Sequence, residues 1–303
     1  IQAPPGDFIE SYIAGLEAVG ETVDASEADL LREQYGLNSS FLTRYTKWMK
    51  LLMRGDLGRS MEYRGVTNNE LIAERLLLTV MLGLFTIVFT WSLAVPIGIL
   101  SAIKQYSFID YFFTFISYIG VGTPNFLLAL LIMWFIWDWW GLKVTSLFSP
   151  EYSDVPWSFA RFVDMLKHIW VPMLILGTDG TARFVRIIRA NLLDELQKPY
   201  VETARAKGLP EWKLVLKYPT RIALNPFVST LGWQLPSLFS GSLIVAQVMS
   251  LPTLGPLLLE ALISQDMFLA GSIIMILTAL TMIGTLISDI LLALMDPRIR
   301  MSG

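Results

Sequence analysis

Long apolar stretches without charged residues alternate along the chain with short polar ones, a pattern that predicts helices crossing a membrane. A helix needs about 20 mainly apolar residues to cross the hydrocarbon layer. Five stretches are predicted spans: residues 76–103, 111–137, 169–182 with their flanks, 222–249 and 267–294. The stretch 222–249 is interrupted by two prolines but contains no ionisable residue. The sequence therefore predicts an all-α integral membrane protein with five visible transmembrane helices.

Basic residues in the short loops orient these helices, because Lys and Arg gather on the cytoplasmic side of a membrane. Residues 183–221 hold nine Lys and Arg against four Asp and Glu, whereas residues 250–266 hold two acidic residues and no basic one. The first loop is therefore predicted to be cytoplasmic and the second external. Alternation through the spans then places residues 1–75 outside.

The first residues resemble the end of an apolar helix, because Pro4, Pro5 and Gly6 together break helical structure. The chain also begins with neither Met nor a signal-like segment, although its amino terminus is expected outside. We therefore expect a further span upstream of Ile1, which would bring the number of spans to six.

The stretch that follows is polar, with apolar residues at helical intervals, as in the run of Tyr45, Trp48 and Leu52. Such a pattern predicts short amphipathic helices rather than further spans. Two domains are expected: an external amphipathic helical segment over residues 1–75, following the missing first span, and a transmembrane domain over residues 76–303.

The composition agrees with a membrane protein and argues against several chemistries. Hydrophobic residues make up 54% of the chain and charged residues 16%, and the mean hydropathy is +0.54, too apolar for a soluble globular protein of this length. The chain has no cysteine and a single histidine, His168. We therefore expect no catalytic residue, no metal site and no nucleic-acid partner.

The basic loop carries the sequence signals of two helices. Pro199 suits the first turn of a helix, Gly208 can end that helix in a left-handed cap, and Pro210 can open a second helix over residues 211–218. Glu202, in the first turn, complements the helix dipole. The sequence thus predicts two short helices exposed to the cytoplasm.

The second of these helices places Trp212, Val215 and Leu216 on one side. An apolar stripe in so basic a loop needs a protein surface to bury it. The loop is therefore a candidate docking element, although a connection whose charge merely fixes topology is the plainer alternative.

The segment Tyr200-Val201-Glu202-Thr203-Ala204-Arg205-Ala206-Lys207-Gly208-Leu209 resembles the Glu-Ala-Ala…Gly signature of the binding-protein-dependent permeases of ABC importers. The match is to the dipeptide and oligopeptide branch, which includes carriers of oligosaccharides. The ending Asp296-Pro297-Arg298-Ile299-Arg300 and the pair Leu254-Gly255 followed by Asp266 also resemble this family. Thr203 departs from the signature by replacing the first Ala of its Ala pair.

The resemblance implies a permease subunit of an ATP-driven importer that moves solute by alternating access. Residues 76–303 would be the permease domain, and residues 199–221 a coupling loop. No Walker-type Gly-x-x-x-x-Gly-Lys-Ser/Thr occurs in the chain, so we expect it to be no enzyme and to hold no cofactor, with ATP and Mg²⁺ bound by a partner ATPase.

The resemblance also implies partners and a location. The implied partners are a second homologous permease subunit, two ATP-binding subunits, an external solute-binding protein, a peptide or oligosaccharide substrate, and membrane lipid. The location would be the bacterial or archaeal cytoplasmic (inner) membrane. The implied ATPase-coupling residues are Tyr200, Glu202, Thr203, Ala204, Arg205, Ala206, Lys207, Gly208, Leu209 and Trp212, and the implied binding-protein-facing residues are Pro252, Leu254, Gly255 and Asp266.

Two other classes of protein remain as alternatives, an ion-coupled secondary transporter and a membrane scaffold. A secondary transporter should carry charged residues at mid-membrane. Asp179 lies near the inner end of a predicted span, where it could serve such a function, but pairing with Arg183 one helical turn on is the simpler expectation. Asp110 lies near another inner helix end, where we expect water to reach it.

Overall fold

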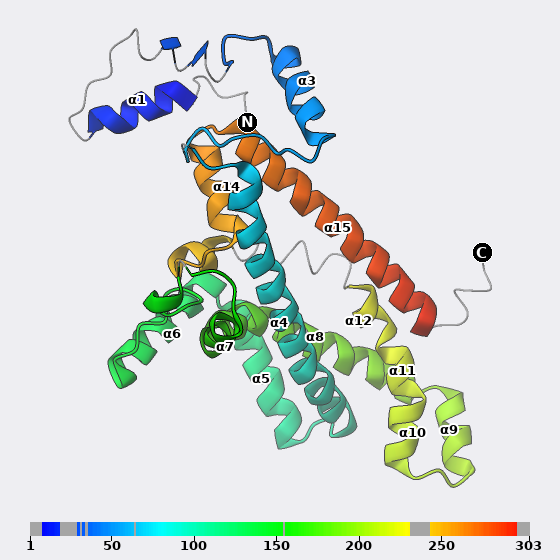
Figure 1. Cartoon of the computed structure of the whole chain (residues 1–303). Helices are drawn as coiled ribbons and strands as arrows, with labels where there is room; N and C mark the ends of the chain where they lie inside the picture. The colour runs from blue at the N-terminus through cyan, green and yellow to red at the C-terminus, as the bar shows by residue number, and fades with distance from the viewer. Residues whose placement is uncertain are drawn as a thin grey trace. The chain divides into compact units, whose positions relative to one another are not determined.

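In the computed structural model the chain is helical (Figure 1). The structure describes residues 8–18, 29–30, 32–33, 36–63, 65–153, 155–230 and 243–295. Across these ranges the only extended pairing is an isolated bridge between Arg59 and Thr67. The predicted all-α class is therefore confirmed. The inferred first span, the stretch around Pro236 and the carboxyl-terminal Asp296–Arg300 motif lie outside the described residues.

The chain divides into two compact units. Unit 1 comprises Ile1–Thr79 and Pro252–Thr278, and unit 2 comprises Val80–Leu251 and Ala279–Gly303. Two of the three boundaries fall inside long helices, α4 (Asn68–Ile103) and α15 (Met267–Met295), and the third lies between Leu251 and Pro252. The amino-terminal segment thus folds together with a stretch some 200 positions later, a pairing that the hydrophobic pattern does not predict.

Unit 1 contains short amphipathic helices, as the sequence predicts, in α1 (Phe8–Ala18) and α3 (Phe41–Leu52). Ser40 caps α3 by accepting a hydrogen bond from the Thr43 backbone N–H. The unit also contains α14 (Leu254–Ile263) and the adjoining parts of the two long helices. Its main core consists of Ile72, Leu254, Leu257, Ala261, Leu269, Ala270 and Ile273.

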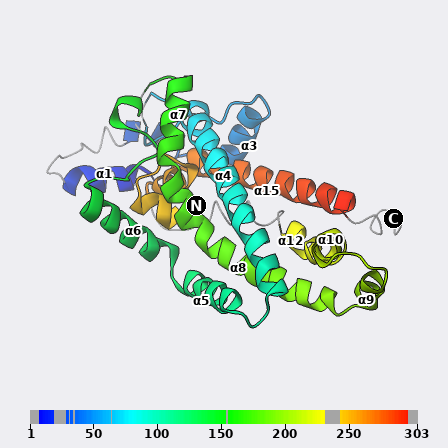
Figure 2. The ribbon, with the colours of Figure 1, turned by 90° about the horizontal axis from the view of Figure 1, so that it is seen from below.

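Unit 2 is organised around one helix, α8 (Trp170–Leu196), which runs between α4 and α5 (Figure 2). Its buried residues Val185, Ile188 and Leu192 form one core with α4 and with the segments that follow α8. The remaining described elements of this unit before the basic loop are α5 (Phe108–Gly122), α6 (Asn125–Trp140), the 3₁₀ turn η1 (Pro150–Tyr152) and α7 (Phe159–His168).

Of the predicted spans, two appear as single helices that are long and apolar enough to cross a membrane, α4 and α15. The apolar stretch predicted as a span over residues 111–137, with Pro124 inside it, forms the two helices α5 and α6, and the chain bends by 105° between them. The cause is local: Pro124 forces the preceding residue out of the helical region, and Thr123 is extended with φ −97° and ψ 119°.

The other two predicted spans also differ from the sequence expectation. The helix predicted at residues 169–182 continues as α8 through a charged stretch to Leu196. The predicted span at residues 222–249 begins with two short helices, α11 (Pro219–Ala223) and α12 (Asn225–Ser229). Residues 231–242 of that stretch are not among the described residues.

The expectation for Asp179 is confirmed, whereas the expectation for Asp110 is wrong. Asp179 accepts a hydrogen bond from Arg183 at 2.9 Å, as expected for neighbours one helical turn apart. Asp110, which we expected to be wetted, is only 2% exposed and pairs with Arg189 of α8. Its burial follows from a partner 79 positions away, which no local pattern indicates.

The close approach of α4 to α8 gives a test of this packing. A Cβ atom at Gly98 would lie 2.9 Å from both Cβ and Cγ2 of Ile188 and 3.2 Å from the Val185 carbonyl oxygen. Ile is stiff at χ1, so the clash outweighs the gain of about 1 kcal/mol in helix propensity. We expect Gly98→Ala to lower the free energy of unfolding by about 1–2 kcal/mol, measured by thermal unfolding of the solubilised protein.

Gly122→Ala is the matched control, because a Cβ atom there would meet nothing within 4 Å. It should leave the midpoint of thermal unfolding unchanged or slightly higher. Equal midpoints for the two variants would contradict the close packing of α4 on α8.

Candidate functional site

The basic loop folds into the two short helices that its prolines and glycine predict, which lie side by side in Figure 1. The first is α9 (Pro199–Ala206), with Pro199 in its first turn. Gly208 follows with φ +74°, in the left-handed region. The Gly208 N–H donates to the Arg205 carbonyl at 2.9 Å and the Leu209 N–H to the Ala204 carbonyl at 3.4 Å. These two bonds form a complete Schellman cap, so the predicted left-handed end is confirmed.

The second helix is α10 (Glu211–Lys217), which begins after Pro210 and ends one residue earlier than predicted. A helix of this length is not stable by itself in water. Leu214 and Val215 supply the missing stability, because both are buried in the core of unit 2. Val201 of α9 and Leu192 of α8 belong to the same core. The inner faces of both short helices therefore face a core that they share with α8, and α10 packs beside α11 (Pro219–Ala223), which in turn packs on α8.

The predicted apolar stripe of Trp212, Val215 and Leu216 is wrong in one member, because Val215 is buried. Val215 faces the core, whereas Trp212 is 63% exposed and Leu216 54% exposed. These two residues are four positions apart and share a helix face. Lys213 lies beside them, with its Nζ 5.3 Å from the centre of the Trp212 ring. The outward face of α10 thus combines a large apolar surface with positive charge.

An ion pair joins the two short helices. The Nε of Arg205 donates to both carboxylate oxygens of Glu211, at 3.1 and 3.0 Å, and its Nη2 also donates to this carboxylate. The hydrogen bonds from Arg205 lower the pKa of Glu211. Both side chains are about half exposed, so the pair contributes no more than about 1 kcal/mol to stability. It links the last turn of α9 to the first turn of α10.

Two further side chains of the predicted set are engaged within the chain. The Tyr200 hydroxyl donates to Glu195 at 2.7 Å, and burial, followed by this bond, raises the pKa of Tyr200. The Thr203 hydroxyl donates to the Pro199 carbonyl at 3.0 Å, within its own helix. A threonine can therefore replace the signature alanine without leaving a polar atom unpaired.

The other predicted coupling residues divide by exposure. Ala204 and Leu209 are half-buried. Of the predicted coupling residues, the exposed ones are Tyr200, Glu202, Thr203, Arg205, Ala206, Lys207, Gly208 and Trp212. We call these residues, together with the exposed Leu216, the loop surface.

The residues predicted to face an external partner lie in unit 1, and two of them have fully buried side chains, Leu254 and Asp266. Asp266 accepts hydrogen bonds from the Ser60 hydroxyl at 2.8 Å and the Met61 N–H at 2.6 Å. Both side chains organise the segment from inside, and their predicted role toward an external partner stays a prediction. Pro252 and Gly255 are half-buried and reach the surface.

Asp266 also alters its surroundings electrostatically. Burial, then the charges of Asp266 and Glu260, raise the pKa of Glu62. The Tyr63 hydroxyl donates to Glu260. Sequence reasoning missed these contacts because the residues are some 200 positions apart.

Apolar helices of membrane-spanning length and an anchored pair of basic helices define this chain as a helical membrane protein. A comparison with known proteins makes the class specific. The family described as "Binding-protein-dependent transport system inner membrane component" matches residues 94–301. The chain belongs to this family and is a permease subunit of an ABC importer.

Relatives agree with this assignment. The chain is 33% identical over 280 residues to the oligopeptide transport system permease protein AppB of Bacillus subtilis (strain 168), covering 91% of this chain and 86% of the relative. It is 28% identical over 290 residues to the dipeptide transport system permease protein DppB of Escherichia coli (strain K12), covering 90% and 85%.

A solved structure shows a similar fold. A chain from the inward-facing MetNI methionine ABC transporter superposes with a TM-score of 0.58 at 16% identity. The match covers 75% of this chain and 96% of the solved one.

A side chain at Gly208 could be unfavourable because of backbone strain or because of a steric clash, and substitutions there distinguish the two causes. A Cβ atom there would meet nothing within 4 Å, so only the positive φ resists substitution. Asn tolerates this region and a β-branched residue does not. We expect Gly208→Val to weaken the cap by roughly 1–2 kcal/mol and to speed hydrogen exchange at the Leu209 amide about tenfold.

Gly208→Asn is the control and should exchange at nearly the rate of the unmodified protein, as measured by hydrogen-exchange mass spectrometry. If Val and Asn protect the Leu209 amide equally, the left-handed cap does not determine the end of α9.

Proposed function

We propose that this chain carries peptides across a bacterial or archaeal cytoplasmic membrane as the pore subunit of an ATP-driven importer. Peptides are preferred to oligosaccharides as cargo because AppB and DppB are named for oligopeptides and dipeptides. The proposed permease domain is residues 76–303, and the pore opens alternately to the two sides of the membrane.

The proposed complex contains a second permease, two ATP-binding subunits and an external solute-binding protein. ATP and Mg²⁺ bind to the ATPase subunits, and this chain contributes no cofactor site. Residues 1–75 and 252–266 face the binding protein, with Pro252 and Gly255 at the surface. The coupling loop, residues 199–221, docks on an ATPase subunit.

The observation that carries this proposal is the exposure of Trp212 and Leu216 on a helix whose other face is anchored in the core. Exposed Trp is a frequent centre of protein interfaces, because it buries a large area with little loss of conformational freedom. Lys213, beside it, favours a partner groove with an acidic rim. Trp212 and Leu216 form an exposed apolar surface on an anchored helix, with positive charge beside it. Such a rigid surface can transmit a partner's movement better than a flexible loop would.

Removing the Trp212 side chain gives a direct test of docking. We expect Trp212→Ser to weaken association with the ATPase subunit by at least about 2 kcal/mol, or roughly 30-fold in Kd. The measurement is the amount of ATPase subunit that co-purifies with the solubilised permease, followed by a titration of purified components.

Phe159→Ser is the matched control, because Phe159 is a large aromatic residue of the same unit that is 82% exposed and lies far from the loop in sequence. It should retain the ATPase subunit fully. Retention of the ATPase subunit by the Trp212 variant would remove the loop surface from the docking interface.

Cargo is tested with the reconstituted complex in vesicles, with the external binding protein present. We expect uptake of a radiolabelled short peptide that requires ATP and that an equal concentration of unlabelled oligosaccharide does not reduce. Uptake driven by an ion gradient without ATP would instead favour a secondary transporter. Competition by the oligosaccharide would make it the cargo.

A further inference from the structure

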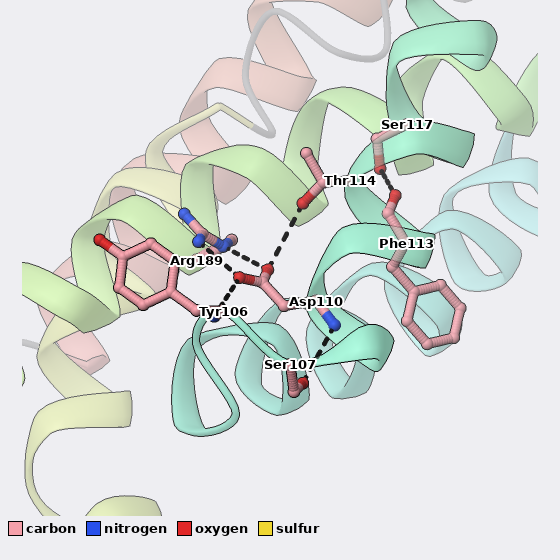
Figure 3. A network of polar contacts seen from close by, with 7 residues as sticks. All are labelled: Tyr106, Ser107, Asp110, Phe113, Thr114, Ser117 and Arg189. Carbon is pink, nitrogen blue, oxygen red and sulfur yellow. Dashed lines mark hydrogen bonds and ion pairs between the residues drawn. The ribbon is translucent and has the colours of Figure 1, made fainter.

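The amino-terminal end of α5 is tied to α8 by a buried ion pair, shown in Figure 3. The Nε of Arg189 donates to one oxygen of Asp110 at 2.7 Å, and its Nη2 donates to the other, also at 2.7 Å. Tyr106 donates its backbone N–H to the same carboxylate at 3.0 Å, and the Thr114 hydroxyl donates at 3.4 Å. Each carboxylate oxygen thus accepts two hydrogen bonds.

This geometry resists partial loosening. The planar guanidinium matches the carboxylate at two points, which fixes orientation as well as distance. A buried carboxylate that loses its partner is left as an uncompensated charge, which is strongly unfavourable. Breaking the pair is therefore costly, even though Tyr106 and Thr114 still donate to the carboxylate.

Two further contacts hold α5 against α8 toward its other end. A Cβ atom at Gly120 would lie 3.0 Å from the Ala182 Cβ and 3.3 Å from the Thr178 Cγ2. The guanidinium carbon of Arg186 lies 5.1 Å from the centre of the Tyr118 ring. The two helices run antiparallel and touch along most of α5.

The two ends of this helix pair lead to different parts of the molecule. At one end α8 continues through Leu192, buried with Val201, into the basic loop. At the other end α5 stops at Gly122, where the chain turns by 105° into α6. The pair is one packed connection between the loop and this bend, and α6, beyond the bend, also packs on α8.

We propose that Asp110 and Arg189 are positioning residues of the transport cycle. Their ion pair makes α5 move as one body with α8 and the basic loop, so that movement of the docked ATPase reaches the bend between α5 and α6. This inference rests on the proposed docking of the loop on an ATPase. The alternative is a pair that only stabilises the fold.

The two roles differ in the number of ATP molecules hydrolysed per solute molecule transported. A purely stabilising pair, once broken, lowers the amount of complex, so hydrolysis and transport fall together. A positioning pair, once broken, leaves hydrolysis running while transport fails. In the reconstituted complex we expect Asp110→Asn to raise the ratio about tenfold, and Asp110→Glu, which keeps the charge, to restore most of the coupling.

Asp179→Asn is the matched control. It also removes a carboxylate paired with an arginine of α8, at 2.9 Å, but that pair lies within one helix. Its ratio should change by less than about twofold. An unchanged ratio in the Asp110 variant, or an equal rise in both variants, would overturn the proposal.

A second measurement leaves the ion pair intact and does not depend on the stability of a variant. The chain contains no cysteine, so spin labels can be placed at Tyr111→Cys on α5 and Ala190→Cys on α8, both exposed positions. The other subunits are used with their cysteines replaced. The distance between the labels should be the same in the nucleotide-free and ATP-trapped complexes.

A distance that changes with nucleotide while the ion pair is intact would overturn the proposal, whatever the variants do. Loss of ATPase binding by the unmodified chain would instead refute the docking on which the inference rests, and the inference with it. Normal docking and coupling in the Asp110→Asn complex would refute the ion pair's role alone.

Discussion

Close packing of α8 between two neighbouring helices determines the position of the basic loop. At Gly98 the approach of α4 leaves no room for a methyl group beside Ile188, and at Gly120 the approach of α5 leaves little beside Ala182. Protein interiors are packed as tightly as organic crystals, so α8 cannot slide without displacing both neighbours. The loop begins within three residues of the end of α8 and shares its core. A displacement imposed on the loop therefore becomes a displacement of α8.

The same packing explains why α10 exposes the residues that it does. A helix of seven residues has too few internal hydrogen bonds to be stable alone. Leu214 and Val215 bury enough surface to hold it, and helix geometry then directs Trp212 and Leu216 outward. The exposure of a large apolar side chain is thus a consequence of how the helix is anchored. A flexible loop would have allowed Trp212 to fold back onto the protein.

Sequence reasoning succeeded where the determining contacts are local. The ends of α9 depend on Pro199 and Gly208 and on hydrogen bonds within five residues, so they could be predicted. The side of α10 that is buried depends on the core it shares with other helices of unit 2, which explains why the spacing placed Val215 in the exposed stripe. The bend at Thr123 follows from Pro124, the residue after it, although the size of the bend, 105°, does not follow from a proline alone.

The pattern of hydrophobic and polar residues could not predict contacts between distant segments. The union of residues 1–79 with 252–278 and the burial of Asp266 depend on tertiary structure, because hydropathy measures one segment at a time. Asp266 is adjacent to an external loop by every sequence criterion, yet its carboxylate faces inward to the backbone of Met61. An acidic residue beside a span can therefore be structural, although position alone suggests a surface role.

The ion pairs of unit 2 bear on the alternative of an ion-coupled transporter. Such a protein needs a buried carboxylate that can exchange its partner for a cation or a proton. Asp179 is paired one turn away on the same helix, and both oxygens of Asp110 accept hydrogen bonds from Arg189. A cation at Asp110 would first have to displace a two-point guanidinium contact. The buried charge of Asp110 is therefore suited to holding α5 against α8 rather than to exchanging its partner for a transported cation.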